Sequence, residues 1–365
     1  MDRSAYELIF SAFAFVLGAV VGSFLNVCIY RLPLNLSINK PRRSFCPHCK
    51  TPIPWYQNIP LASWLLLRGR CAHCGASIRF RYFGVELITA FLFFAVWRAF
   101  PWPLALAYWV FVSLVIIATF VDFEHFIIPD QVTIGGTIAG IVASFLVPEL
   151  MNTESRLAAA VRALLAAALG YIVLLLVLEA GKLAFGKKRI RLDGPTPFTW
   201  KRHGDDAEFV LGAEQSLWSD YFAREKDRLL LKCEDAKIDN HVHNKVTLEF
   251  YYNRVTAEDQ TLMLDDINEI SGTALEVVIP REAMGRGDLK FLAAIGAFLG
   301  WRAVLFSVFA GSLAGSLVGL FTLLVGKRVW SAKLPFGPYL ALGALAWMFF
   351  GDAFVRWYIG VVSPP

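Results

Sequence analysis

Several features that mark other classes of protein are missing from this 365-residue sequence. It has no low-complexity tract and no internal repeat, which argues against a disordered linker protein and against a repeat array. It has no glycine-rich phosphate-binding loop, so the sequence singles out no residue that would bind a nucleotide phosphate. The first apolar stretch is not followed by a signal-peptidase cleavage pattern, so we expect it to be retained as a membrane span.

The polar composition of a soluble protein is also missing. Hydrophobic residues make up 56% of the chain and the mean hydropathy is +0.52, while Lys and Arg exceed Asp and Glu by only five. One soluble core does not need so much apolar surface. We therefore expect an integral membrane protein.

Apolar runs of about 20 residues predict the spans. The expected fold is an all-α polytopic membrane protein of about eight transmembrane helices, with a cytoplasmic zinc-knuckle segment and an inserted small, mostly-β soluble domain. The eight candidate spans are 6–29, 84–100, 103–121, 131–149, 157–181, 288–302, 303–326 and 336–360.

The basic residues predict the orientation, because Lys and Arg concentrate in cytoplasmic loops. They crowd the stretches 31–50, 68–81, 182–192 and 327–333. Both termini should therefore face outward. The expected organisation is a first helix at 1–30, a cytoplasmic zinc-binding segment at 31–83, helices at 84–182, an inserted cytoplasmic soluble domain at 183–283, and helices at 284–365.

Four of the six cysteines form two C-x-x-C pairs, Cys46 with Cys49 and Cys71 with Cys74. Two such knuckles can close a tetrahedral thiolate cage around zinc, and four thiolates leave no open position for a substrate, so the metal would be structural. His48 or His73 could replace a cysteine as ligand. The alternative is a pair of disulfides or redox dithiols, which a reducing cytosol and the absence of a thioredoxin-like pattern disfavour. Cys28 and Cys233 are expected to be packing or surface residues.

The stretch 183–283 contains alternating runs such as "KVTLEFYYNRV", typical of strands, and "SDYFAREKDRLLLK" at 219–232, which favours a short helix. His241 and His243 lack partners for a metal site and are expected to be ordinary surface or strand residues.

Two aspartates stand at expected span ends. Asp122 closes one span in "TFVDFEHFIIPD", and Asp288 opens another in "EAMGRGDLKFLAAIGAFLG". Each alone has a structural explanation, an interfacial residue for Asp122 and an N-cap for Asp288. Ionisable residues at membrane depth are nevertheless costly. Two neighbouring carboxylates would share one proton and divide the roles of acid and base. Glu124 and His125 could tune such a pair or simply face lipid headgroups, as could Lys290.

The motifs together resemble the type IV prepilin peptidase family. They are "GAVVGSFLNVCIYRLP", the two cysteine knuckles around "NIPLASWLLLRGRC", then "YFGVELITAFLF", "VDFEHFIIPD" and "GRGDLKFLAAIGAFLG". The resemblance implies a bifunctional membrane enzyme. It would cut the leader from prepilins or pseudopilins on the cytoplasmic side, and then methylate the new N-terminal amine with S-adenosylmethionine.

By this resemblance Asp122 and Asp288 are the catalytic aspartates, and the four knuckle cysteines bind structural zinc. Gly285 and Gly287 would let the backbone approach an extended substrate, and Lys290 and Asp130 would support the pair. The resemblance also implies a multi-pass protein of the bacterial inner membrane, in contact with lipid, with pilus or secretion assembly proteins as further possible partners and no nucleic acid. The S-adenosylmethionine-binding residues are not identified.

The chain departs from the family pattern by about a hundred residues inserted before the second aspartate. Three alternatives to the full activity stay open: a peptidase without methylation, a proton-coupled transporter that uses the membrane aspartates, and a non-catalytic assembly scaffold.

Overall fold

The computed structural model describes residues 3–40, 44–46, 48–185, 187–203, 206–222, 228–239, 241–258, 260–280, 285–325 and 335–362. These residues form two compact units. The membrane unit comprises Met1–Leu176 and Met284–Pro365, and the β unit comprises Val177–Ala283. Each unit is described by itself below.

Within the described residues, six helices are long and apolar enough to cross a membrane. They are α1 (Arg3–Arg31), α3 (Arg81–Ala99), α4 (Leu104–His125), α6 (Arg156–Phe185), α7 (Arg286–Leu324) and α8 (Gly337–Val362), with the shorter α5 (Asp130–Leu146) between α4 and α6. Many large apolar side chains on these helices are exposed, as expected where lipid covers a protein. A multi-pass membrane protein is therefore confirmed.

The expected number of eight spans is not confirmed. The two spans predicted at 288–302 and 303–326 both fall on α7. Gly300 interrupts that helix with φ 78° and ψ 177°, a conformation that glycine adopts readily. The predicted span at 131–149 corresponds to α5, which has 17 residues and is short for a crossing.

Small residues bring the helices of the membrane unit close together. A Cβ added to Gly170 of α6 would lie 2.6 Å from the carbonyl oxygen of Leu292, and one added to Gly296 of α7 would lie 2.4 Å from that of Ala166. These helices therefore pack backbone to backbone, antiparallel. Glycine contacts of this kind are common between membrane helices, because close van der Waals packing supplies much of their association energy.

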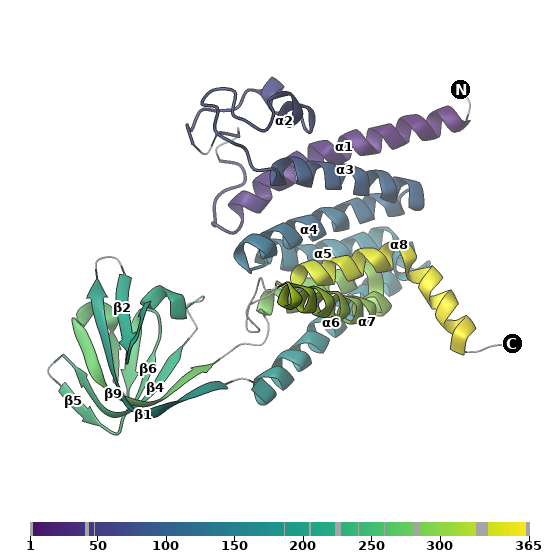
Figure 1. The fold of residues 1–365 in the computed structure, drawn as a ribbon. Helices are drawn as coiled ribbons and strands as arrows, with labels where there is room; N and C mark the ends of the chain where they lie inside the picture. The colour runs from purple at the N-terminus through teal and green to yellow at the C-terminus, as the bar shows by residue number, and fades with distance from the viewer. Residues whose placement is uncertain are drawn as a thin grey trace. The chain divides into compact units, whose positions relative to one another are not determined.

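The β unit is a nine-stranded antiparallel sheet in the described residues, drawn as arrows in Figure 1. The strands are β1 (Lys187–His203), β2 (Asp206–Leu211), β3 (Glu214–Leu217), β4 (Leu229–Ile238), β5 (His241–Asn244), β6 (Thr247–Phe250), β7 (Arg254–Ala257), β8 (Gln260–Met263) and β9 (Glu269–Pro280). The order is β3-β2-β1-β9-β4-β6-β7-β8, with β5 paired to β4. The inserted β-sheet domain is therefore confirmed.

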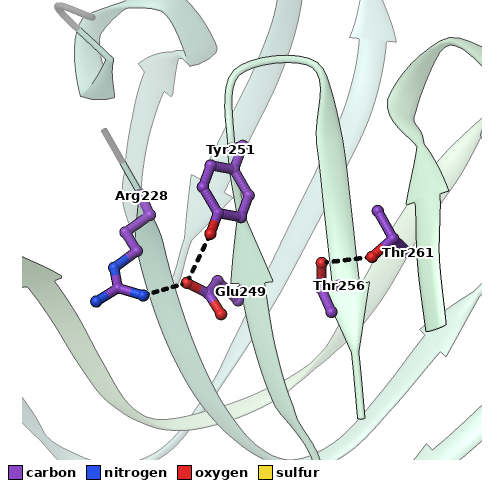
Figure 2. A network of polar contacts seen from close by, with 5 residues as sticks. All are labelled: Arg228, Glu249, Tyr251, Thr256 and Thr261. Atoms are coloured by element: carbon purple, nitrogen blue, oxygen red, sulfur yellow. Dashed lines mark hydrogen bonds and ion pairs between the residues drawn. The ribbon is translucent and has the colours of Figure 1, made fainter. Parts of the chain in front are cut away.

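The two faces of this sheet differ. One face forms a buried core that includes Phe198, Trp200, Phe209 and Phe250. Figure 2 shows polar contacts near β4, β6, β7 and β8. The guanidinium of Arg228 and the hydroxyl of Tyr251 donate to Glu249 at 2.6 and 3.0 Å, and the hydroxyls of Thr256 and Thr261 are 3.1 Å apart. A buried apolar face together with a polar face is typical of an antiparallel sheet that has its own core.

The helix expected over 219–232 is wrong at both described ends. Its start lies in a single 3-10 turn, η3 (Trp218–Tyr221), and Leu229–Lys232 belongs to β4, where Leu229 and Leu231 point into the core. Residues 223–227 lie outside the described residues. The alternation of buried and exposed positions in "LLLKCEDAKI" favours a strand, and it outweighs the helical propensity of these residues. Cys28 and Cys233 are buried, as expected of packing residues.

Four short helical segments complete the described structure: η1 (Trp55–Gln57) and α2 (Ala62–Leu66) between the cysteine knuckles, η2 (Pro148–Met151) after α5, and η4 (Leu264–Asp266) before β9.

Candidate active site and metal centre

Asp122 lies in the last turn of α4 and is 5% exposed. The helix ends because Phe126 adopts a left-handed conformation, φ 54°, from which its N–H still donates to the carbonyl oxygen of Asp122 at 3.0 Å. The backbone N–H of Gly337 donates to Oδ2 of Asp122 at 2.9 Å. A carboxylate thus meets the N-terminus of α8, the end of a helix that favours negative charge.

Asp288 lies in the first turn of α7 and is 7% exposed. Its backbone N–H donates to the carbonyl oxygen of Gly285 at 3.2 Å. Asp288 therefore stands inside the first turn, after Arg286 and Gly287, and not at the N-cap position that the structural alternative gave it.

Ile128 connects the surroundings of the two aspartates. A Cβ added to Gly287 would lie 3.3 Å from Cβ of Ile128, and one added to Gly337 would lie 3.0 Å from its Cδ1 and 2.7 Å from Oδ2 of Asp122. Gly287 directly precedes Asp288. The structure therefore gathers the end of α4, the start of α7 and the start of α8 around one buried isoleucine.

An aromatic contact supports the same alignment. The rings of Phe111 in α4 and Phe298 in α7 are 5.3 Å apart. Phe111 precedes Asp122 by eleven residues, and Phe298 follows Gly287 by eleven. Because each helical residue advances about 1.5 Å, Asp122 and Gly287 lie at similar heights along the two antiparallel helices.

Lys290 and Asp130 contact each other. Lys290 Nζ is 2.6 Å from Oδ1 of Asp130, and the pair links the first turns of α7 and α5. Glu124 forms an ion pair with Arg81 at the start of α3, and His125 is exposed. These contacts favour a role in holding helix ends together over direct tuning of either aspartate.

The four knuckle cysteines form the metal centre. Their sulfur atoms all lie within 4.8 Å of one another, and those of Cys46 and Cys74 are 3.8 Å apart. His48 and His73 are exposed and are not members of this cluster. Four soft sulfur donors at this separation fit zinc, the metal for which such sets are typical.

The two knuckles have the same backbone design. Cys46 N–H donates to the carbonyl oxygen of Thr51 at 3.0 Å, as Cys71 N–H does to that of Ala76 at 2.9 Å. The residue after each second cysteine, Lys50 or Gly75, has a positive φ. Each turn thereby brings its two sulfurs to one side.

The thiols in this cluster differ in acidity. Hydrogen bonds from Thr51 lower the pKa of Cys49 to about 6, and backbone hydrogen bonds at Cys74 and His73 lower the pKa of Cys71. For Cys74 the backbone hydrogen bond from Ala76 is outweighed by partial desolvation and by hydrogen bonds with the neighbouring cysteine thiols, which raise its pKa to about 11. A metal cation would neutralise the negative charge that four thiolates would otherwise concentrate here.

Reasoning from the sequence missed Gly337 and Ile128. Gly337 precedes Pro338 at the start of the last apolar run, in "PFGPYL". Proline is common in the first turn of a helix, where its missing N–H costs nothing, so a Gly-Pro pair at this place indicates the start of a helix. That signal was present. The contact of this helix N-terminus with Asp122 could not be predicted, because Asp122 is 215 residues away in sequence.

Comparison with known families gives two matches. The Bacterial Peptidase A24 N-terminal domain matches residues 16–100, and the Type IV leader peptidase family matches residues 109–188 and 262–320. Together they cover more than half of the chain. The residues between the two parts of the second match, 189–261, belong to the β unit.

Several curated relatives share one name, Prepilin leader peptidase/N-methyltransferase. A Prepilin leader peptidase/N-methyltransferase of Myxococcus xanthus is 51% identical over 138 residues, which are 38% of this chain and 41% of that relative. Proteins of that name from Aeromonas hydrophila and Legionella pneumophila are 28% and 27% identical, over 96% and 93% of this chain and 94% and 91% of their own lengths. No solved structure matches the chain.

Proposed function

Since this chain belongs to the type IV leader peptidase family, we propose that it is a membrane aspartic endopeptidase that removes the leader peptide from type IV prepilins or pseudopilins. The observation that carries the proposal is the convergence of the ends of α4, α7 and α8 around Ile128, which gathers two buried aspartates at helix ends. A non-catalytic scaffold would not need two buried carboxylates.

In the proposed reaction Asp122 and Asp288 share one proton. One carboxylate takes a proton from a water molecule, and the hydroxide attacks the carbonyl carbon of the scissile peptide bond. The protonated partner donates its proton to the carbonyl oxygen. The C–N bond then breaks, the carbonyl forms again and returns that proton to the same carboxylate, and the amine leaves with the proton that the first carboxylate took from water. The Gly337 N–H already occupies Oδ2 of Asp122, so Oδ1 is the oxygen that we assign to the water or the shared proton.

We assign Gly337 and Ile128 as positioning residues, and we keep Gly285 and Gly287 as places where the backbone can approach an extended substrate. Gly287 already contacts Ile128 closely, and this favours a first role in packing. The ion pair of Lys290 and Asp130 would keep α7 and α5 aligned.

The second proposed step is methylation of the new N-terminal amine, with S-adenosylmethionine as the methyl donor. The names of the relatives support it. Zinc bound by Cys46, Cys49, Cys71 and Cys74 would be structural, since four protein ligands fill a tetrahedral site.

We also propose that the protein resides in the bacterial inner membrane with its active site toward the cytoplasm. The basic stretches at 31–50, 68–81, 182–192 and 327–333 support this orientation.

The test is incubation of the purified full-length protein with a prepilin, with and without S-adenosylmethionine, followed by mass measurement of the product. We expect loss of the leader in both reactions and one added methyl group only with the methyl donor. An intact prepilin in both reactions would refute the peptidase. A cleaved but unmethylated product would leave a peptidase alone.

A further inference from the structure

A second set of polar groups lies between α1 and α3, the two helices that flank the cysteine knuckles in sequence. The helices run antiparallel in close contact, as Figure 1 shows. A Cβ added to Gly18 would lie 2.8 Å from Cα of Ala90, and one added to Gly22 would lie 2.8 Å from Cα of Glu86. One further turn along, Asn26 meets Tyr82.

Asn26 holds a buried acceptor without a donor. The residue is 4% exposed, and its Nδ2 donates to the carbonyl oxygen of Tyr82 at 2.9 Å. Because a carbonyl oxygen can only accept, this bond fixes which end of the amide is nitrogen. The other end, Oδ1, is buried and has no hydrogen-bond partner in the described part of the chain. Orphaned groups of this kind are rare in proteins.

Glu86 lies one turn after Tyr82 on the same face of α3. Its Oε2 accepts the backbone N–H of Leu61 at 2.7 Å. Leu61 has φ 62°, a positive value that is strained for a leucine, and it lies between the two knuckles. Among the described residues Glu86 has no basic partner within ion-pair distance. A carboxylate on an apolar helix without a cation is a candidate binding group.

We propose that Asn26 Oδ1 and the Glu86 carboxylate bind the free α-amino group of the processed substrate for methyl transfer, an inference that rests on the proposed function. Both groups are acceptors, and an ammonium group offers three N–H donors and a positive charge. Both stand near the ends of their helices next to the knuckle segment, where an N-terminus at the membrane surface would be reached.

The chemistry assigns Glu86 a second task. A protonated amine has no lone pair, so the carboxylate first accepts a proton from the ammonium group. The neutral nitrogen then forms a bond to the methyl carbon of S-adenosylmethionine while the carbon–sulfur bond breaks, and S-adenosylhomocysteine leaves. The resulting secondary ammonium retains the positive charge that the sulfonium loses. Glu86 passes its proton to water.

This assignment also connects the two cysteine knuckles with the position of Glu86. The Leu61 N–H that Glu86 accepts belongs to the segment that the metal centre folds. Loss of the metal should therefore misplace Glu86 as well as loosen the segment.

The test uses a peptide that already has the mature pilin N-terminus and a free amine, so that methylation does not depend on prior cleavage. Full-length wild type, Glu86→Gln and Asn26→Leu are compared in methyl transfer from S-adenosylmethionine, and in leader cleavage of a prepilin. Thr89→Val is the matched control, because Thr89 is buried on α3 and its hydroxyl donates to the Val85 carbonyl oxygen of its own helix, at 2.6 Å.

We expect kcat/KM for methylation to fall about 100-fold in both variants, with a higher KM for the peptide and an unchanged KM for S-adenosylmethionine. Cleavage and zinc content should stay at wild-type values, and Thr89→Val should retain both activities.

Wild-type methylation by both variants would overturn the assignment. A rise in KM for S-adenosylmethionine alone would assign the two acceptors to the methyl donor instead. Parallel loss of cleavage, methylation and zinc would show that they only brace the helices. If wild type cleaves prepilin but does not methylate the peptide, the methylation step of the proposed function fails and this inference with it.

Discussion

At the scale of single residues, the candidate site depends on two glycines that contribute a backbone group and space rather than a side chain. Gly337 contributes a backbone N–H and the space for Asp122, and Gly287 contributes close contact with Ile128. Both roles require the absence of a Cβ. The aspartates supply the chemistry, and these glycines determine where the carboxylates can lie.

Gly337→Ala should therefore impair cleavage directly. Its Cβ would lie 2.7 Å from Oδ2 of Asp122, so either the carboxylate or the start of α8 must move. Loss of a hydrogen bond to a charged group costs about 1.5–3 kcal/mol, which corresponds to roughly a ten- to hundredfold lower kcat/KM. The measurement is the cleavage rate of a prepilin at matched folded concentration, together with its pH profile.

Gly343→Ala is the control for this prediction. Its Cβ would crowd the backbone of Ser307 at 2.9 Å, elsewhere on the same helix. It should lower thermal stability while folded protein cleaves at the wild-type rate. Equal losses of cleavage in the two variants would contradict a specific role for Gly337.

The cysteines give a second prediction at this scale. Cys49→Ser or Cys74→Ser should release the metal, because thiolate sulfur binds zinc far better than a hydroxyl does. Elemental analysis should find about one zinc per wild-type chain and much less in a double variant. Cys233→Ser, in the core of the β unit, is the control and should retain its zinc. An unchanged metal content in the double variant would mean that the knuckles are not the ligands.

At the scale of elements, the starts and ends of helices carry the candidate site. Asp122 ends α4, while Asp288 and Gly337 stand at the starts of α7 and α8. The spacing of apolar runs predicted these ends well, because hydropathy and the length of a span are local properties. The break at Gly300 inside α7 lies close to the boundary predicted between the spans 288–302 and 303–326, although a glycine within an apolar run does not by itself identify the residue at which a helix breaks.

Contacts between distant elements could not be predicted from the sequence. The cysteine cluster was predictable, because each knuckle is a local motif with metal-ligand spacing. The pairing of Lys290 with Asp130 and the contact of Gly337 with Asp122 join residues 160 and 215 positions apart. No local pattern encodes such partners.

The ion pair of Lys290 and Asp130 gives a prediction at this scale. Asp130→Lys or Lys290→Asp should each slow cleavage by a few-fold, and the double exchange should restore most of the rate, because an exposed pair contributes at most about 1 kcal/mol. If Lys290 instead tuned the aspartates directly, the double variant would be as slow as Lys290→Asp alone.

At the scale of the whole molecule, the β unit is an insertion with adjacent ends. β1 and β9 pair antiparallel from Lys187 and Pro280 onward, so the chain enters and leaves the sheet at neighbouring positions. The unit also has its own core. Both facts indicate that it can be removed without straining the helices that flank it. We propose that it acts as a lid or docking surface for the substrate or for assembly proteins.

Replacing residues 187–279 with a flexible Gly/Ser linker should therefore spare peptide-bond cleavage but change the affinity for different prepilins. Cleavage of the native prepilin and of a heterologous one is compared with wild type at matched folded concentration. Identical rates and affinities on both substrates would rule out docking. A joint fall of thermal stability and cleavage would identify the β unit as a brace.

The central claim is that Asp122 and Asp288 together cut the leader peptide. Its most direct test is the cleavage rate of a prepilin by Asp122→Asn and Asp288→Asn, with Asp352→Asn, an exposed aspartate of α8, as control. We expect a loss of at least about 100-fold in each of the two variants, with normal membrane insertion and zinc content, and a wild-type rate in the control. Wild-type cleavage by either variant would contradict the claim.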